Sequence, residues 1–157
     1  MWPNFEDRAS YKEYTDGLVQ ARGMVPLKDL SKLPHLDAHG DPALFVVMNG
    51  RTSGTRLGCV NGLHSTRRTF SEFGIEEVDS LEIGVVPSGK GPLPFSKCGD
   101  SGAGVFDRDG RVLGIVNGGA GPTNTTDVTF VSPFWWILDR IHEVYDDAGI
   151  YPATSDD

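Results

Sequence analysis

Short apolar runs separated by turn residues dominate the middle of the chain. The runs at residues 43–48 and 81–86 are rich in branched side chains, and they end at Asn49-Gly50 and at Pro87. Runs of this length and composition are typical of buried β-strands. About six or seven short strands at this spacing predict an antiparallel barrel or sandwich. The further strands are predicted at residues 57–60, 63–70, 103–106, 111–116 and 127–131, with a hairpin turn at Asn61-Gly62.

A helical period replaces the strand pattern after residue 131. Apolar side chains then recur at intervals of three and four, which predicts an amphipathic helix. These residues are Phe134, Ile137, Leu138, Ile141 and Tyr145. Ser132 is expected to cap the helix and Pro133 to be its first residue, with an end near Gly149. The helix is expected to dock on the barrel, with at least one of Trp135 and Trp136 in the core.

The first 33 residues differ from the strand-rich body. Residues 5–21 carry a mediocre amphipathic pattern among many charges, and residues 26–34 form a polar connector. The predicted organisation is a helical arm with its connector at residues 1–33, a barrel with its terminal helix at 34–150, and a frayed tail at 151–157.

Composition narrows the class of partner. With 157 residues and 38% apolar side chains, the chain suits one packed domain. The net charge of −8 argues against a nucleic-acid partner, because proteins that bind the phosphate backbone are usually basic. No apolar run approaches the roughly 18 residues of a membrane helix, so no membrane partner is expected. With no secretory leader and only Cys59 and Cys98, we expect free thiols and favour a cytoplasmic location.

The tetrapeptide Gly99-Asp100-Ser101-Gly102 is the motif that carries chemistry. A serine hydroxyl is a poor nucleophile unless a tight turn presents it, a base stands beside it and donors await the oxyanion. The amides of Gly99 and Ser101 can point at a substrate carbonyl, and Gly102 lets the chain leave the turn. Asp100 can brace the turn from behind. The alternative is a plain polar β-turn, since Gly, Asp and Ser are common turn residues.

Residues 99–119 resemble the trypsin/chymotrypsin-like serine peptidases, in which the serine turn runs into a hairpin and then into the substrate-binding segment. The resemblance implies an all-β fold: an antiparallel six-stranded Greek-key barrel, the second half of a double barrel, with a C-terminal helix. It implies Ser101 as nucleophile and an oxyanion hole formed by the amides of Gly99 and Ser101. It also implies that Asn117, Gly118 and Gly119 pair with the backbone of a polypeptide substrate. The chain is further similar to uncharacterised fungal trypsin-like proteins at residues 36–42, 49–55 and 127–138.

The chain departs from this family in the other two members of the catalytic triad. In the family, the histidine and the aspartate precede the serine on a separate first barrel, which is missing here. Upstream of Ser101 the sequence has only His35, His39 and His64, and none stands in the family's context. We expect His39 in a solvated turn and His64 on a strand surface. No histidine pair has zinc-site spacing, so neither a metal nor another cofactor is predicted.

Two functions from different classes stay open. The first is the C-terminal half of a serine endopeptidase, which acts by acyl transfer through Ser101 with the histidine and aspartate upstream or on a partner chain. The second is a catalytically inactive relic or a protein-binding barrel. In both cases a lone barrel exposes the face that would meet its partner barrel, which predicts self-association or a partner protein.

Overall fold

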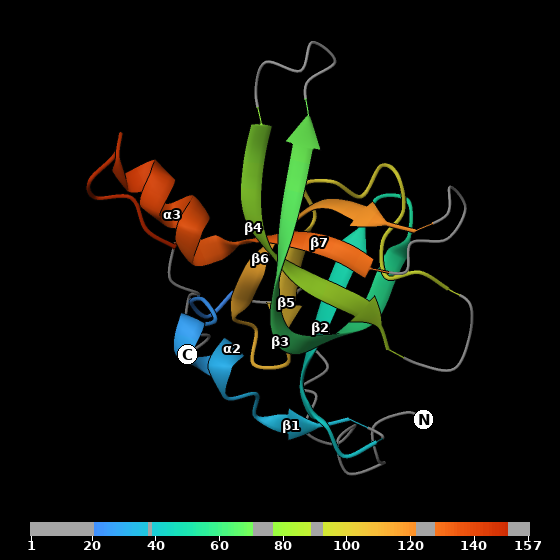
Figure 1. The fold of residues 1–157 in the computed structure, drawn as a ribbon. Helices are drawn as coiled ribbons and strands as arrows, with labels where there is room; N and C mark the ends of the chain where they lie inside the picture. The colour runs from blue at the N-terminus through green and yellow to red at the C-terminus, as the bar shows by residue number, and fades with distance from the viewer. Residues whose placement is uncertain (1–20, 38, 71–76, 89–92, 122–127, 151–157) are drawn as a thin grey trace.

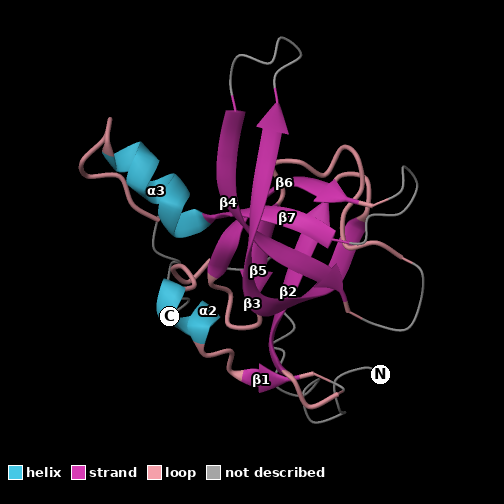
Figure 2. Cartoon of the chain, in the orientation of Figure 1, coloured by secondary structure: helices cyan, strands magenta, loops and turns pink. Residues whose placement is uncertain are grey.

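The computed structural model describes residues 21–37, 39–70, 77–88, 93–121 and 128–150 (Figure 1). Strands account for most of the regular structure, as Figure 2 shows. In chain order the elements are α2 (Leu27–Ser31), β1 (His35–Leu36), β2 (Pro42–Gly50), β3 (Gly54–Phe70), β4 (Glu77–Pro87), β5 (Gly104–Asp107), β6 (Val112–Ala120), β7 (Val128–Pro133) and α3 (Phe134–His142).

Six of these strands form a closed antiparallel barrel. The strands hydrogen-bond in the order β1-β2-β3-β4-β7-β6-β5, and β5 also pairs with β2, which closes the ring. The closing pairs join Val46 to Asp107, Val47 to Phe106 and Met48 to Val105. Strands β4 and β5 are consecutive in the chain but are separated in the sheet by β7 and β6, as in a Greek key. The predicted six-stranded barrel with a C-terminal helix is therefore confirmed.

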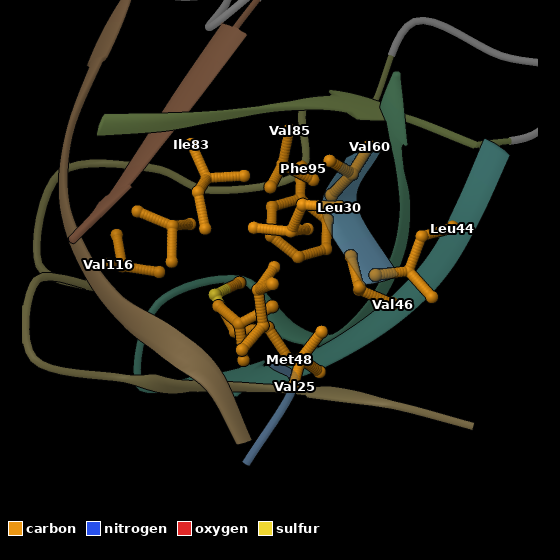
Figure 3. Packing of buried hydrophobic residues seen from close by; sticks show 13 residues of the cluster. Val25, Leu30, Leu44, Val46, Met48, Val60, Ile83, Val85, Phe95 and Val116 are labelled. Atoms are coloured by element: carbon orange, nitrogen blue, oxygen red, sulfur yellow. The ribbon is translucent and has the colours of Figure 1, made fainter. Parts of the chain in front are cut away.

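The core fills the inside of the barrel. Along β2, the buried residues Leu44, Val46 and Met48 alternate with the half-buried Phe45 and Val47, because successive side chains of a strand point to opposite faces. Figure 3 shows side chains from several strands pointing toward one another in this core. The buried cluster consists of Val25, Leu30, Leu44, Val46, Met48, Val60, Ile83, Val85, Phe95, Val105, Leu113, Val116 and Val131.

The prediction of a hairpin turn at Asn61-Gly62 is wrong, because β3 continues through this dipeptide. On both sides of this dipeptide β3 pairs with β4, from Val60↔Val85 to His64↔Ile83. Three residues of β3, 61–63, thus lie opposite one residue of β4, Gly84, so the ladder contains a bulge. Gly62 has φ +79°, a conformation that a bulge and a hairpin turn both require, and for this reason the dipeptide alone is ambiguous.

Residues 22–33 are attached to the barrel. The amide of Val25 donates to the Val112 carbonyl at 2.9 Å, and the amide of Val112 donates to the Gly23 carbonyl at 2.9 Å. Leu30, in α2, is 3% exposed, so the predicted polar connector at residues 26–34 contributes to the core, and so does Val25 just before it, at 2%. The predicted helix at residues 5–21 falls almost wholly outside the described residues, and so does the predicted tail at 151–157.

Helix α3 differs from the prediction at both ends and in its burial. Its N-cap is Pro133, with no side-chain capping hydrogen bond, because the Ser132 hydroxyl donates instead to Glu82 at 3.0 Å. The helix ends at His142 rather than near Gly149. It contains no buried residue, and Trp136 is 48% exposed, so the prediction of a core tryptophan is wrong. The physical reason is visible in Figure 1: α3 points away from the barrel, and its main contacts are with β6 and β7. No described helix is long and apolar enough to cross a membrane.

Candidate active site

The serine turn lies immediately before β5, and Ser101 is exposed at its tip. Two backbone hydrogen bonds close the turn: the Asp100 amide donates to the Lys97 carbonyl at 3.0 Å, and the Ala103 amide donates to the Asp100 carbonyl at 3.0 Å. A third bond, from the Gly102 amide to the Val116 carbonyl at 2.8 Å, attaches the turn to β6. The hydroxyl of Ser101 is thus presented to solvent on a backbone that is held on both sides.

Two glycines make this turn sterically accessible. Gly99 and Gly102 have φ +98° and +89°, in the region that favours glycine. A Cβ atom at Gly99 would also lie 2.5 Å from Oγ1 of Thr52, whereas a Cβ atom at Gly102 would meet nothing within 4 Å. Gly99 is therefore required by its conformation and by its neighbour, and Gly102 by its conformation alone.

The amides of Gly99 and Ser101 are available as donors. Neither donates a hydrogen bond to any residue in the described part of the chain, although the neighbouring amides of Asp100 and Gly102 both do. Unpaired backbone N–H groups at a tight turn are the type of donor that stabilises a developing oxyanion. The arrangement has the donors and the hydroxyl that acyl transfer requires.

Asp100 braces the turn from within the protein. It is 1% exposed, and its Oδ1 accepts hydrogen bonds from the amides of Thr52 at 2.7 Å and Ser53 at 3.1 Å. Its Oδ2 accepts from the amide of Lys97 at 2.8 Å. Gly50 packs against this carboxylate, which leaves no room for a Cβ atom there. Burial raises the pKa of Asp100, but the contacts with Ser53, Lys97 and Thr52 outweigh it, so the pKa lies below the ordinary value.

The edge of β6 is open directly beyond the serine turn. The amide of Val116 donates to the Ala103 carbonyl at 2.9 Å, and β5 pairs with β6 only as far as Ile115. Farther along, β7 pairs with Gly118 and Gly119 on one side, and no described strand pairs with the other side. An extended peptide can therefore add to this edge as a strand, next to Ser101.

The side chain of Asn117 belongs to a polar cluster that the sequence did not reveal. Its Nδ2 donates to Oε1 of Glu82 at 2.9 Å, and its Oδ1 accepts from Nη1 of Arg67 at 3.3 Å. Glu82 is 2% exposed, and its second oxygen accepts from the Ser132 hydroxyl. These four residues come from four different strands, so no local pattern in the sequence could have connected them.

The structure brings no histidine to Ser101. The Ser101 hydroxyl makes no hydrogen bond to any described residue. His39 is exposed in a turn, where its amide donates to Asp37 at 2.7 Å, and His64 is exposed on β3, as the sequence predicted. His35 packs beside the ring of Phe45, with centroids 5.9 Å apart.

Both cysteines are free thiols, as predicted. Burial raises the pKa of Cys59, and the charge of Asp37 raises it further. Cys98 is exposed next to Gly99. Among the described residues, no group of three His, Cys, Asp or Glu side chains is placed to hold a metal ion.

Comparison with known proteins finds a likeness of fold. No protein-family model and no curated protein matches the sequence. Two solved proteases are distantly similar in structure. Protease A of Thermobifida fusca matches with 22% identity and a TM-score of 0.48, over 82% of this chain and 55% of that chain. The active form of the Rv3671c protease of M. tuberculosis matches with 15% identity and a TM-score of 0.49, over 85% of this chain and 50% of that one. The chain spans about half the length of these proteases.

Proposed function

We propose that this chain is the nucleophile-bearing half of a trypsin-like serine endopeptidase, with Ser101 as the nucleophile. The observation that carries the proposal is the exposed hydroxyl of Ser101 on a glycine-flanked turn, with the amides of Gly99 and Ser101 unpaired within the described residues. The open edge of β6 supports it, since it can align a polypeptide beside that hydroxyl.

The reaction is acyl transfer. Oγ of Ser101 attacks the carbonyl carbon of a peptide bond while its proton passes to a base, and the carbonyl oxygen becomes an oxyanion held by the amides of Gly99 and Ser101. The base then protonates the leaving amine as the C–N bond breaks, which leaves an ester on Ser101. Water, deprotonated by the same base, hydrolyses the ester and restores the hydroxyl.

The base comes from a polypeptide outside these residues. The chain has four histidines, and none of them hydrogen-bonds to Ser101. The outer face of the barrel offers a surface for such a partner: Leu57 and Val86 are each 38% exposed, and they flank Cys59, which pairs with Val86. This face supports a partner barrel or self-association.

No described residue acts as a base beside Ser101, and this also favours a second function. In that case the barrel is a catalytically inactive binding domain, and the serine turn and the open edge of β6 bind a polypeptide without cleaving it.

Chemical rescue separates the two functions. The protein is treated with a fluorophosphonate probe with and without imidazole, which supplies the missing base from solution, and the Ser101→Ala variant is the control. An endopeptidase half is expected to be labelled in a reaction that requires Ser101 and becomes faster with imidazole. Equal labelling of the two proteins, or none in either, rejects Ser101 as nucleophile and favours the binding domain.

Substitution of the two glycines of the turn tests the oxyanion hole in the same labelling experiment. Gly99→Ala is expected to slow the labelling of Ser101 by about 10²-fold, because its Cβ displaces an oxyanion donor against Thr52. Gly102→Ala, which has a similar φ but open space, is the matched control and is expected to have a smaller effect. Equal effects of the two substitutions would argue against a role of the Gly99 amide.

A further inference from the structure

Arg67 lies against the strand that the substrate would join. Its Nη1 donates to Oδ1 of Asn117 at 3.3 Å, although the two residues are 50 positions apart in the sequence. A Cβ atom built on Gly118 would stand 3.3 Å from the same nitrogen and 3.6 Å from Cζ of Arg67. The guanidinium therefore covers β6 at Asn117 and Gly118, immediately beyond Val116, whose amide still bonds to Ala103, and glycine at position 118 leaves room for it.

Within the described part of the chain, no carboxylate forms an ion pair with this guanidinium. The carboxamide of Asn117 stands between Arg67 and Glu82, donating to Glu82 at 2.9 Å. Both oxygens of Glu82 are occupied, one by Asn117 and one by Ser132. A guanidinium has five N–H donors, and among the described residues Arg67 donates with one of them, to Asn117, so the described residues leave most of its donors for a ligand.

A peptide strand on the open edge would bring its side chains within reach of these donors. Residues that face each other across an antiparallel pair have Cβ atoms about 4.5–5.5 Å apart. A carboxylate on the peptide residue opposite Asn117 or Gly118 can therefore reach the guanidinium of Arg67, which lies over the same two residues. Arginine and carboxylate pair through two parallel hydrogen bonds, so the geometry of the pair as well as its charge favours Asp or Glu.

We infer that the open edge of β6 selects polypeptides with an acidic side chain opposite Asn117–Gly118, and that Arg67 is the specificity-determining residue. The inference rests on the proposed function only in taking the β6 edge as the peptide-binding strand. The protein's net charge of −8 does not oppose this selection at short range, because salt screens charges beyond about 8–10 Å.

The inference is tested by binding, in a protein that cannot cleave. Fluorescein-labelled hexapeptides with Glu, Gln or Lys at each position in turn are titrated with the Ser101→Ala variant, and binding is followed by fluorescence anisotropy. At one peptide position Glu is expected to bind about fivefold more tightly than Gln, as for one hydrogen bond to a charged group that is partly exposed. This preference is expected to decrease as the salt concentration rises.

Substitutions of Arg67 assign the preference to its side chain. With Arg67→Gln the difference between Glu and Gln peptides is expected to disappear, and with Arg67→Glu the Lys peptide is expected to bind best. Arg68→Gln is the matched control: Arg68 is the next residue on β3 and its side chain points to the opposite face, so the preference for Glu is expected to remain. Retention of the native fold in each variant is checked by circular dichroism.

The outcomes distinguish this inference from the proposed function. Equal binding of Glu and Gln peptides at every position, or no binding, overturns the selection of acidic peptides even where Ser101 reacts with the fluorophosphonate probe. A preference for Glu that survives Arg67→Gln overturns the assignment to Arg67. A preference that depends on Arg67 supports the inference even where Ser101 remains unlabelled, in which case the endopeptidase proposal alone fails.

Discussion

Asp100 and Ser101 are neighbours in the sequence with opposite environments. Asp100 is 1% exposed, and its carboxylate accepts hydrogen bonds from the amides of Thr52, Ser53 and Lys97. Ser101, in contrast, is exposed at the tip of the turn. The buried carboxylate thereby connects the serine turn to the turn between β2 and β3, and the hydroxyl remains free to react. The position of the proposed nucleophile depends on the charge of the residue before it.

Asp100→Asn is expected to lower the free energy of unfolding by about 1–3 kcal/mol at pH 7, because one of the three amides then faces an NH₂ group instead of an acceptor. The pKa of Asp100 in the folded protein is below its ordinary value of 3.8. The stabilisation from its carboxylate is therefore complete above that pH and is lost as the pH falls below it, towards the lower pKa of the folded state.

Urea unfolding of both proteins from pH 7 to pH 2.5 measures this dependence. The difference between wild type and Asp100→Asn should decrease as the pH falls below 3.8, and a difference that stays constant would contradict the prediction. Asp109→Asn is the control, since that side chain is 63% exposed and its loss should change the stability by less than about 0.5 kcal/mol.

Strand β3 shows how one long element organises the site. Because it continues through Gly62, it pairs with β2 in its first half and with β4 along most of its length, and its far half carries Arg67 to the open edge of β6. A hairpin at Asn61-Gly62 would have ended this strand before Arg67. The bulge is thus the local feature on which the proposed specificity depends.

Gly62→Ala is expected to destabilise the protein by more than about 2 kcal/mol. A non-glycine residue at positive φ costs about 1–2 kcal/mol, and a Cβ atom here would also lie 2.8 Å from the carbonyl oxygen of Leu30. Gly54→Ala is the matched control, with φ +65° and nothing within 4 Å, and only the conformational cost is expected. If urea unfolding shows the same loss of unfolding free energy for Gly62→Ala and Gly54→Ala, the close approach of Gly62 to the Leu30 carbonyl of α2 does not contribute to the destabilisation.

The described part of the molecule is a closed barrel with one further segment attached to its side. The pairing of β5 with β2 completes the ring, and residues 22–30 attach to its side through Val25 and Leu30. A salt bridge of 2.7 Å between Arg111 and Asp29 joins α2 to the residue immediately before β6. The segment before the strands should therefore unfold together with the barrel.

Leu30→Ala is expected to lower the free energy of unfolding by about 2–5 kcal/mol while the transition remains a single one, because Leu30 is 3% exposed in the shared core. Leu27→Ala in the same helix is the control: Leu27 is 48% exposed, and a loss below about 1 kcal/mol is expected. If Leu30→Ala leaves the unfolding transition unchanged, or if a second unfolding transition is seen at lower urea concentration, α2 is independent of the barrel.

The sequence alone was enough to predict the features that depend on neighbouring residues. Most of the strands, the terminal helix and the serine turn follow from alternation, helical period and glycine placement, all of which act over a few residues. The errors also have local causes. Glycine at positive φ suits a bulge as well as a hairpin, and an amphipathic helix after β7 does not reveal how closely it packs on the barrel.

The remaining features required the folded chain, because they join residues far apart in sequence. Thr52 and Asp100 are 48 positions apart, Glu82 and Asn117 are 35 apart, and Arg67 and Asn117 are 50 apart. These pairs come within hydrogen-bonding distance only when the strands assemble into the barrel. A tetrapeptide was enough to propose Ser101 as the nucleophile, whereas its bracing by Asp100 and the charge beside the open edge arise from packing between strands that no local pattern connects.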